Sequence, residues 1–188
     1  MAYKQLKQNL PRLTHGAVTQ AWKIPDNSVL YLPVGSSLSF LTGTSCHIGN
    51  EKFEIVGDIG EGDQLDLIAK SFINAPYLWG GRTHFGIDCS GFTQIVFRLM
   101  GVDLKRDASL QAEQGILVDT LAETKLGDLA FFNNAEDKIT HVGILLNNNY
   151  IIHASGKVKV DVIDNKGIYS TQLKRYTHNL NCIKRFFK

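Results

Sequence analysis

The spacing of apolar residues changes at one polar, glycine-bearing stretch, residues 57–63, and this change divides the chain. Before the stretch, apolar residues alternate with polar ones in short segments that turn residues separate. Short strands at such spacing predict a small antiparallel β-barrel or half-barrel. The segments are residues 29–32, 38–41 and 53–56.

After the stretch, apolar residues recur at the spacing of an amphipathic helix. We expect this helix to run from residue 64 to about residue 74, with Asp63 as its N-cap and Ala75-Pro76 at its end. The predicted fold class is therefore α+β, with two domains. A small β domain is expected over residues 1–60 and a larger mixed domain over residues 61–188.

The larger domain contains further patterned segments. A helix is expected over residues 89–100, because apolar side chains recur three and four positions apart and Gly101 stands where a helix-ending glycine belongs. A hairpin is expected to turn at three asparagines, residues 147–149. The other expected elements are a short helix between Asp107 and Gly115, a strand over residues 129–132 and a last strand near residues 182–186.

Composition excludes several classes of function. The chain has 188 residues, enough for a small domain beside a compact larger one, and its hydrophobic fraction of 44% is ordinary for a globular protein. A net charge of +2 is too weak to predict binding to nucleic acid or to a membrane surface. No apolar run approaches a membrane span, and the first residues lack the apolar core of a signal peptide, so we expect a cytoplasmic protein.

Three cysteines stand far apart in the sequence: Cys46, Cys89 and Cys182. An odd number leaves at least one thiol unpaired within the chain, which fits a reducing compartment. The chain has no CxxC pair of the kind that predicts a zinc knuckle or a redox motif. Cys46 and Cys182 lie in strand-like segments and are expected to be inert.

Cys89 falls in the first turn of the helix expected over residues 89–100, directly after Asp88, a good N-cap residue. The positive end of a helix dipole favours a thiolate, and the free N–H groups of a first turn can hold an oxyanion. The competing interpretation is a buried, inert cysteine, which is a common fate of this residue type. The position makes Cys89 a candidate nucleophile for acyl transfer.

His141 and His153 lie on the two segments of the expected hairpin. If its loop is the three asparagines, Leu146 faces Tyr150, and His153 then faces Gly143, which would leave space beside it. The two histidines would share one face as diagonal neighbours, about 7–8 Å apart at Cα. A loop one residue shorter or longer would put them on opposite faces. The predicted geometry is one in which one imidazole orients the other and fixes its tautomer.

Four segments together resemble the motifs of the NlpC/P60 family of cell-wall peptidases, in order and spacing, across roughly residues 60–188. The resemblance implies a papain-like domain, in which a helix that carries the cysteine packs against a small antiparallel sheet. It implies Cys89 as nucleophile, His141 as general base and His153 as the orienting third member, without cofactor or metal. The segments are Tyr77-Leu78-Trp79-Gly80-Gly81, Asp88-Cys89-Ser90-Gly91-Phe92, Gly127-Asp128-Leu129-Ala130-Phe131-Phe132 and His141-Val142-Gly143-Ile144.

Residues 1–60 resemble a bacterial SH3-type domain, and the whole chain is similar to γ-D-glutamyl-L-diamino acid endopeptidases of murein recycling. This similarity implies hydrolysis of the bond between D-γ-glutamate and a diamino acid in peptidoglycan stem peptides that begin with a free L-alanine. It also implies three substrate-binding residues. Asp88 would bind the free amine through charge-assisted hydrogen bonds, Ser90 would add a neighbouring contact, and Tyr77 would line the site. Asp88 is thus expected both to cap the helix and to bind substrate.

Other residues are expected to be structural. Arg106 precedes the short helix and is interpreted as a surface charge, with Asp107 as the cap. His84 is expected to be solvated in its loop, and Trp79 to pack against the domain.

Three alternative functions stay open. The same cysteine–histidine scaffold also serves acyl transfer or amidation, since fold alone does not determine the reaction. A non-catalytic cell-wall binding module is suggested by the SH3-like segment, although such a module has no use for a base beside a thiol. A zinc site is the third, because one cysteine and two histidines are legitimate ligands.

Overall fold

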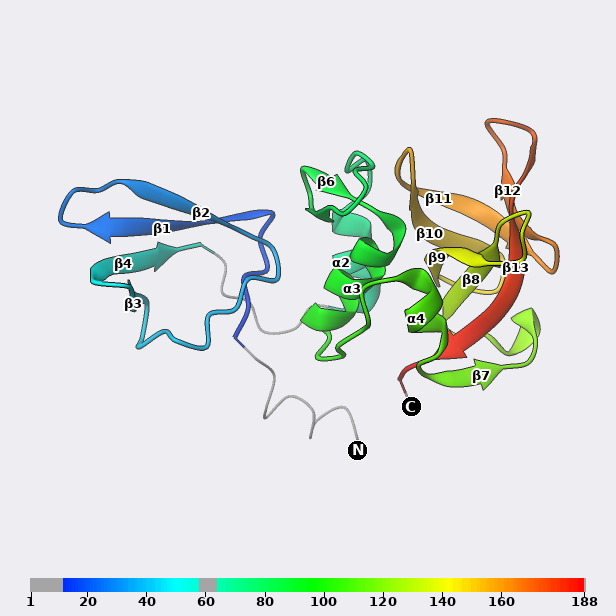
Figure 1. Ribbon diagram of the computed structural model, residues 1–188, viewed down its shortest axis with the longest axis horizontal. Coiled ribbons are helices and arrows are strands. Elements are labelled where there is room, and N and C mark those ends of the chain that lie inside the picture. The colour runs from blue at the N-terminus through cyan, green and yellow to red at the C-terminus, as the bar shows by residue number, and fades with distance from the viewer. Residues whose placement is uncertain (1–11, 58–63, 188) are drawn as a thin grey trace. The chain divides into compact units, whose positions relative to one another are not determined.

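The computed structural model describes residues 12–57 and 64–187, and it divides the chain into two compact units. One unit is formed chiefly by residues up to Asp63, and the other chiefly by residues from Gln64 onward. Figure 1 draws the strands of the first unit in blue and cyan and the elements of the second in green to red. The predicted boundary between residues 60 and 61 lies outside the described residues and stays a prediction. The predicted N-cap Asp63 is wrong, because the helix begins at Leu65 with Gln64 as its N-cap, and the Gln64 carbonyl accepts the N–H groups of Leu67 and Ile68.

The strands of the first unit are β1 (Val18–Ile24), β2 (Val29–Pro33), β3 (Ser45–Ile48) and β4 (Glu51–Val56). They form a four-stranded antiparallel sheet in the order β2-β1-β4-β3. A small core on one face of this sheet consists of Ala21, Cys46, Phe53 and Ile55, all buried. The strands predicted over residues 29–32 and 53–56 are confirmed by β2 and β4.

The strand predicted over residues 38–41 is wrong. Leu38 is fully buried, whereas Phe40, two positions on, is 49% exposed, so the two do not line one buried face. The segment instead forms turns that lead into β3. The pattern also misses β1, because its buried face consists of Thr19 and Ala21, a polar and a small side chain.

The helices of the second unit are α2 (Leu65–Ser71), α3 (Cys89–Leu99) and α4 (Ala108–Ala112), with a short 3₁₀ helix η2 (Leu121–Glu123). α3 and α4 confirm the helices predicted from residue 89 and after Asp107. α2 ends before the predicted residue 74, because Asn74 takes a left-handed conformation (φ 71°) and its N–H donates to the carbonyl of Val158. None of the described helices is both long enough and apolar enough to cross a membrane.

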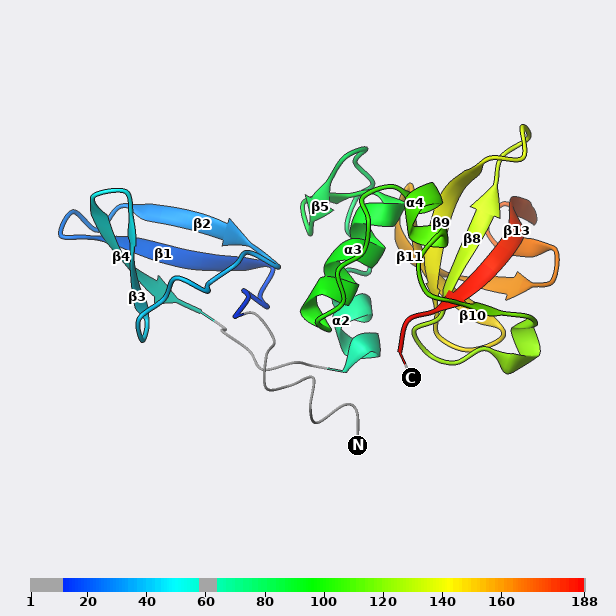
Figure 2. The ribbon, with the colours of Figure 1, turned by 60° about the horizontal axis from the view of Figure 1, so that its bottom comes forward.

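The strands of the second unit form a barrel beside these helices (Figure 2). The sheet order is β12-β11-β10-β9-β8-β13-β7, and an additional pairing of β12 with β13 closes it. A separate two-stranded ribbon joins β5 (Arg82–Thr83) to β6 (Gly86–Ile87). The strands of the barrel sheet are β7 (Ile116–Val118), β8 (Leu129–Asn133), β9 (Ile139–Leu145), β10 (Tyr150–Ser155), β11 (Lys157–Asp164), β12 (Gly167–Ser170) and β13 (Arg175–Arg185).

The predicted hairpin is confirmed with its register. Ile151 pairs with Leu145, and the N–H of Leu146 donates to the carbonyl of Tyr150, so the loop is the three asparagines. β8 and β13 confirm the two other predicted strands of this unit, whereas β7, β11 and β12 are additional. Both faces of β9 and β10 are buried, and the interior face of the barrel carries the cluster Val118, Leu121, Ala130, Phe132, Leu145, Ile151, Ile163, Ile168 and Ile183.

Candidate active site

A cleft of about 560 Å³ opens at the N-terminus of α3, within the second unit. The loop before α3, the start of α3, the segment before α4 and the start of β9 contribute its walls. A titratable thiol, two carboxylates and a guanidinium face this one space, which makes it the candidate site. The lining residues are Trp79, Asp88, Cys89, Ser90, Arg106, Asp107, Ala108, Ser109, Ile139 and Thr140.

Cys89 is the first residue of α3 and is 5% exposed. Its Sγ donates to the carbonyl oxygen of Thr140 at 3.9 Å. The thiol thus lies against the segment of β9 that contains His141. The hydrogen bonds between described residues include none from Cys89 to His141. The arrangement brings the predicted nucleophile beside the strand that carries the predicted base.

Burial raises the pKa of the Cys89 thiol, and the nearby Asp88 carboxylate raises it further, whereas the Val142 N–H acts in the opposite direction. The helix terminus therefore does not leave a free thiolate at neutral pH. Burial also lowers the pKa of His141 well below its usual value, so its imidazole is neutral. The resting pair is a thiol and a neutral base, and the proton must move during attack.

Asp88 is the N-cap of α3, as predicted. Its Oδ1 accepts the N–H of Gly91 at 2.6 Å, and its Oδ2 accepts the N–H of Gly80 at 2.8 Å. Arg106 binds both oxygens, with Nη1 3.1 Å from Oδ1 and Nη2 2.5 Å from Oδ2. Burial acts to raise the pKa of Asp88, but the bonds from Arg106 and the two backbone N–H groups outweigh it and hold the pKa below its usual range.

The interpretation of Arg106 as a surface charge is wrong. The guanidinium pairs with a carboxylate that is only 4% exposed, and its Nη1 also donates to the Ser90 hydroxyl at 2.8 Å. Asp107, next in the chain, caps α4 with no side-chain hydrogen bond and stays exposed in the cleft wall. The Arg106 fork therefore already occupies both oxygens of Asp88, while the Asp107 carboxylate faces the cleft.

The other predicted substrate residues differ in position. Ser90 lines the cleft but is only 6% exposed, and its hydroxyl donates to Asp88 Oδ1 at 3.3 Å. Tyr77 is 36% exposed and is not among the residues that line the cleft. Burial raises its pKa, and the charges of Cys89 and Asp88 raise it further. Trp79 was expected to pack against the domain, but it is 84% exposed at the cleft.

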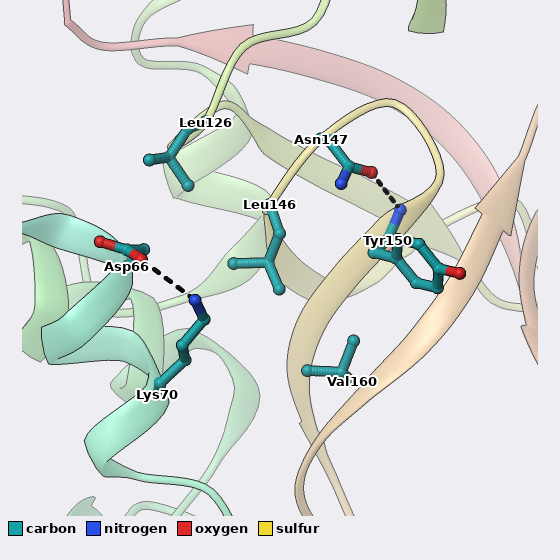
Figure 3. A pocket seen from close by; sticks show the side chains of 7 residues that line it. All are labelled: Asp66, Lys70, Leu126, Leu146, Asn147, Tyr150 and Val160. Carbon is teal, nitrogen blue, oxygen red and sulfur yellow. Dashed lines mark hydrogen bonds and ion pairs between the residues drawn. The ribbon is translucent and has the colours of Figure 1, made fainter.

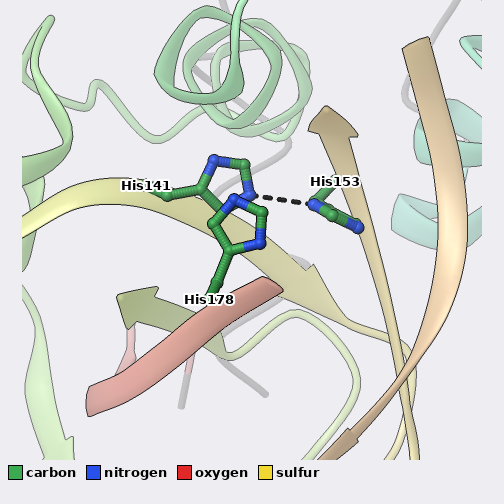
Figure 4. Close-up of side chains that lie close together, drawn as sticks. All are labelled: His141, His153 and His178. Atoms are coloured by element: carbon green, nitrogen blue, oxygen red, sulfur yellow. Dashed lines mark hydrogen bonds between the residues drawn. The ribbon is translucent and has the colours of Figure 1, made fainter. Parts of the chain in front are cut away.

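His141 and His153 share the interior face of the hairpin, as predicted. His141 Nε2 lies 2.8 Å from His153 Nδ1, and the two rings are nearly perpendicular at 85°. Figure 4 shows this bond and the remaining ring nitrogen of His141 pointing away from His153. The space expected beside Gly143 is filled, because a methyl group there would lie 2.9 Å from His153 Cβ and 2.7 Å from Ile151 Cδ1.

The barrel adds two residues to the histidine pair that were not predicted. Asp161 of β11 has Oδ2 3.1 Å from His153 Nε2. His178 of β13 stacks on the His141 ring, with centroids 4.0 Å apart and 23° between planes. Lys-Val alternation before Asp161 was a usable strand signal, but nothing local to either residue indicated which partner it would meet.

Three of these side chains form a candidate metal cluster. Ligand atoms of His141, His153 and His178 all lie within 4.8 Å of one another. Imidazoles that share an ion direct in-plane nitrogen lone pairs at it, whereas the His141 and His178 rings are stacked face to face. His141 Nε2 is also engaged with His153. The arrangement fits a hydrogen-bonded relay better than a metal centre.

A second hollow, of about 270 Å³, lies over α2 and the β9–β10 turn (Figure 3). Its only charged groups, Asp66 and Lys70, pair with each other at 3.0 Å across one helical turn. The remaining lining is Leu126, Leu146, Asn147, Tyr150 and Val160. The lining of this hollow includes no thiol and no imidazole, so Cys89 and its cleft remain the candidate site.

Comparison with known proteins identifies the family to which the second unit is related. Residues 74–177 match the model described as "NlpC/P60 family". A γ-D-glutamyl-L-lysine dipeptidyl-peptidase of Bacillus subtilis (strain 168) is 44% identical over 97 residues, which cover 50% of this chain and 32% of that protein. A probable endopeptidase NlpC of Escherichia coli (strain K12) is 40% identical over 98 residues, covering 51% of this chain and 60% of that protein. The chain spans about a third of the length of the dipeptidyl-peptidase.

Solved structures show the same fold. The structure of an NlpC/P60 family protein from Bacillus cereus ATCC 10987 superposes with a TM-score of 0.72 and 21% sequence identity. The match covers 98% of this chain and 65% of the Bacillus cereus chain. The NlpC/p60 domain of the peptidoglycan hydrolase SagA matches 65% of this chain and 96% of its own, with a TM-score of 0.51 and 28% identity.

Proposed function

Because this chain belongs to the NlpC/P60 family, we propose that it is a cysteine peptidase that hydrolyses the γ-D-glutamyl bond to a diamino acid in peptidoglycan stem peptides. One observation carries the proposal. Cys89, the first residue of α3, contacts the segment of β9 that contains His141, and His141 Nε2 lies 2.8 Å from His153 Nδ1. A thiol beside an oriented neutral imidazole is the arrangement of nucleophilic acyl transfer.

In the proposed reaction, His141 removes the proton from the Cys89 thiol as the sulfur attacks the γ-carbonyl carbon. Free N–H groups in the first turn of α3 would stabilise the oxyanion that forms. The tetrahedral intermediate collapses to a thioester, and the amine of the diamino acid leaves with the proton from His141. Water, deprotonated by His141, then attacks the thioester and restores the thiol.

The charges of the cleft support a substrate with both a carboxylate and an amine. A γ-linked glutamate leaves its α-carboxylate free, and the Arg106 side chain, 34% exposed, offers positive charge there. For the free amine of an N-terminal L-alanine, the cleft offers the carboxylates of Asp88 and Asp107. Because Arg106 already binds both oxygens of Asp88, we propose that the Asp107 carboxylate also binds the substrate amine.

Residues 1–60 are proposed to form an SH3-like domain. Support comes from the antiparallel sheet β2-β1-β4-β3 and from the Bacillus cereus structure, whose match extends over 98% of the chain. The Bacillus subtilis relative is named for γ-D-glutamyl specificity, which supports the same specificity here, and we extend the proposal to peptides released during murein recycling.

Incubation with L-Ala-γ-D-Glu-meso-diaminopimelate, with and without N-acetylation of the alanine, tests the proposal by mass spectrometry. Release of L-Ala-D-Glu from the free peptide alone is the expected result. Equal cleavage of both peptides would retain the peptidase and remove the amine contact. Cleavage of neither by the folded, reduced protein would contradict the proposed function.

The amine contact has its own variant. Asp107→Asn should narrow the preference for the free over the acetylated peptide, because a neutral amide holds an ammonium less strongly than a carboxylate does. Ser109→Ala, in the same cleft wall, is the matched control.

A further inference from the structure

Behind the proposed catalytic pair lies a carboxylate that the proposed reaction does not use. Asp161, on β11, is 9% exposed, and its Oδ2 stands 3.1 Å from His153 Nε2. The strand register explains the contact. His153 pairs with Lys159 and Ile151 with Asp161, so Asp161 is the diagonal neighbour of His153 on the interior face.

An ionised carboxylate accepts hydrogen bonds and donates none. Burial acts to raise the pKa of Asp161, but hydrogen bonds from His153 and Lys159 outweigh it and leave the pKa below its usual range. Lys159 Nζ lies 3.2 Å from the same Oδ2. Asp161 is therefore ionised at neutral pH, and His153 must donate from Nε2 in this contact.

The direction of the next bond follows from counting protons. His153 is fully buried, and burial lowers its pKa, so its ring is neutral and carries one N–H. With that proton on Nε2, the Nδ1 of His153 is an acceptor. His141 Nε2, 2.8 Å away, must then be the donor. The single proton of neutral His141 is on Nε2, and its Nδ1 keeps a lone pair.

We propose that Asp161 is a positioning residue that sets the tautomers of His153 and His141 in sequence and so leaves His141 Nδ1 as the proton acceptor for Cys89. The proposal rests on the proposed peptidase function for its consequence, but the tautomers themselves do not depend on it. Without a fixed acceptor behind His153, that ring can hold its proton on Nδ1. His141 Nε2 would then accept, and its Nδ1 would carry a proton and lose its basicity.

Two further titratable groups face this relay from neighbouring elements. Lys159, on β11, pairs with Asp161, and its charge favours neutral histidines. His178, on β13, stacks on His141, and burial lowers its pKa to about 4, so it is neutral over the range in which the relay works. Neither group offers His153 Nε2 a competing acceptor, because a lysine ammonium only donates and His178 contacts the His153 ring edge to face.

Two-bond ¹H–¹⁵N correlation spectra of the whole chain at neutral pH test the tautomers directly. The expected result is a protonated Nε2 and a bare Nδ1 in both His141 and His153. A His153 protonated on Nδ1 would overturn the proposal. The readout needs no substrate, so it stands even if the chain cleaves no γ-glutamyl peptide, and that second result would count against the proposed function alone.

Two variants of Asp161 distinguish the effect of its hydrogen-bond acceptor from the effect of its negative charge. Asp161→Leu removes the acceptor at similar volume, and should lower kcat by about 10²-fold or more with a smaller effect on KM. Asp161→Asn keeps an oxygen that can accept from His153 Nε2. The Lys159 ammonium can only donate, so it selects the amide orientation in which this oxygen, and not the NH2 group, lies beside Lys159 and His153. This variant should therefore retain the wild-type tautomers and a higher kcat than Asp161→Leu. Equal losses in both variants, with wild-type tautomers in Asp161→Leu, would contradict the proposal. If Asp161→Leu does not fold, the Asp161→Asn spectra and the wild-type spectra decide.

Discussion

Asp88 combines two local roles, since it caps α3 and forms a two-point ion pair with Arg106 beside the thiol. A buried carboxylate of this kind is stable only while its partners remain. The pair therefore also fixes the loop before α3, because Gly80 donates to the same carboxylate. Substrate chemistry at Cys89 depends on this loop keeping its position.

Replacement of Arg106 tests how much the Arg106–Asp88 ion pair contributes to the free energy of unfolding. Arg106→Met leaves Asp88 buried without its counter-ion and should lower the free energy of unfolding by about 2–3 kcal/mol in urea titrations. Asp88→Asn in the same background should recover part of this loss, since no unpaired charge remains. Arg82→Met, at an exposed arginine bonded to Gln94, is the control and should change stability by about 0.5 kcal/mol or less. A loss in Arg106→Met no larger than in the control would contradict the account of Asp88.

Residues whose roles depend on near neighbours could be predicted from the sequence. The cap at Asp88 and the position of Cys89 in a first turn follow from a short local pattern. Arg106, Asp161 and His178 gain their roles from partners on other elements, 18, 8 and 37 positions away, and no single-sequence pattern specifies such pairs. The proposed catalytic roles of Cys89, His141 and His153 stay predictions until activity is measured.

At the scale of elements, the β9–β10 hairpin brings the two histidines together. Its register follows from the loop of three asparagines, and the period of two along a strand then puts both histidines on the interior face. The ends of α2 and the turns at residues 38–41 were harder to predict. In both places backbone pairing with a distant segment or a single buried side chain overrides the local pattern.

Gly143→Ala tests whether the β9–β10 hairpin can accept a larger side chain beside His153. A Cβ at this position would lie 2.7 Å from Ile151 Cδ1 and 2.9 Å from His153 Cβ, closer than side chains pack. The variant should lose about 1–3 kcal/mol of stability and should lower kcat more than KM is raised, because His153 is displaced. Gly16→Ala, whose new methyl meets only ordinary contacts, is the control. Normal kcat in Gly143→Ala would show that the ring positions are not critical.

For the whole molecule, a cluster of neutral histidines inside the barrel makes stability depend on pH. Burial lowers the pKa of His141 and His153, and lowers that of His178 to about 4. Below about pH 6.5 the unfolded chain therefore binds protons that the folded chain does not, and stability falls as the pH drops toward 4. Above pH 6.5 both states are neutral at these rings and their contribution is constant.

His178→Phe should make this dependence shallower. The half-buried ring contributes at most about 3 kcal/mol between pH 7 and pH 4, and phenylalanine keeps the aromatic face on His141 without a titrating group. Urea denaturation at pH 7 and pH 5 measures the slope. His47→Gln, at an exposed histidine of β3, is the control. An unchanged slope in His178→Phe would mean that the stacked ring does not titrate as described.

The most direct test of the central claim is hydrolysis of L-Ala-γ-D-Glu-meso-diaminopimelate by the wild-type chain and by Cys89→Ala, measured as diaminopimelate released over time. The wild type should release diaminopimelate and Cys89→Ala should release none above background, while both show the same circular dichroism spectrum. Release by the folded Cys89→Ala variant at the wild-type rate would contradict the assignment of Cys89 as the nucleophile.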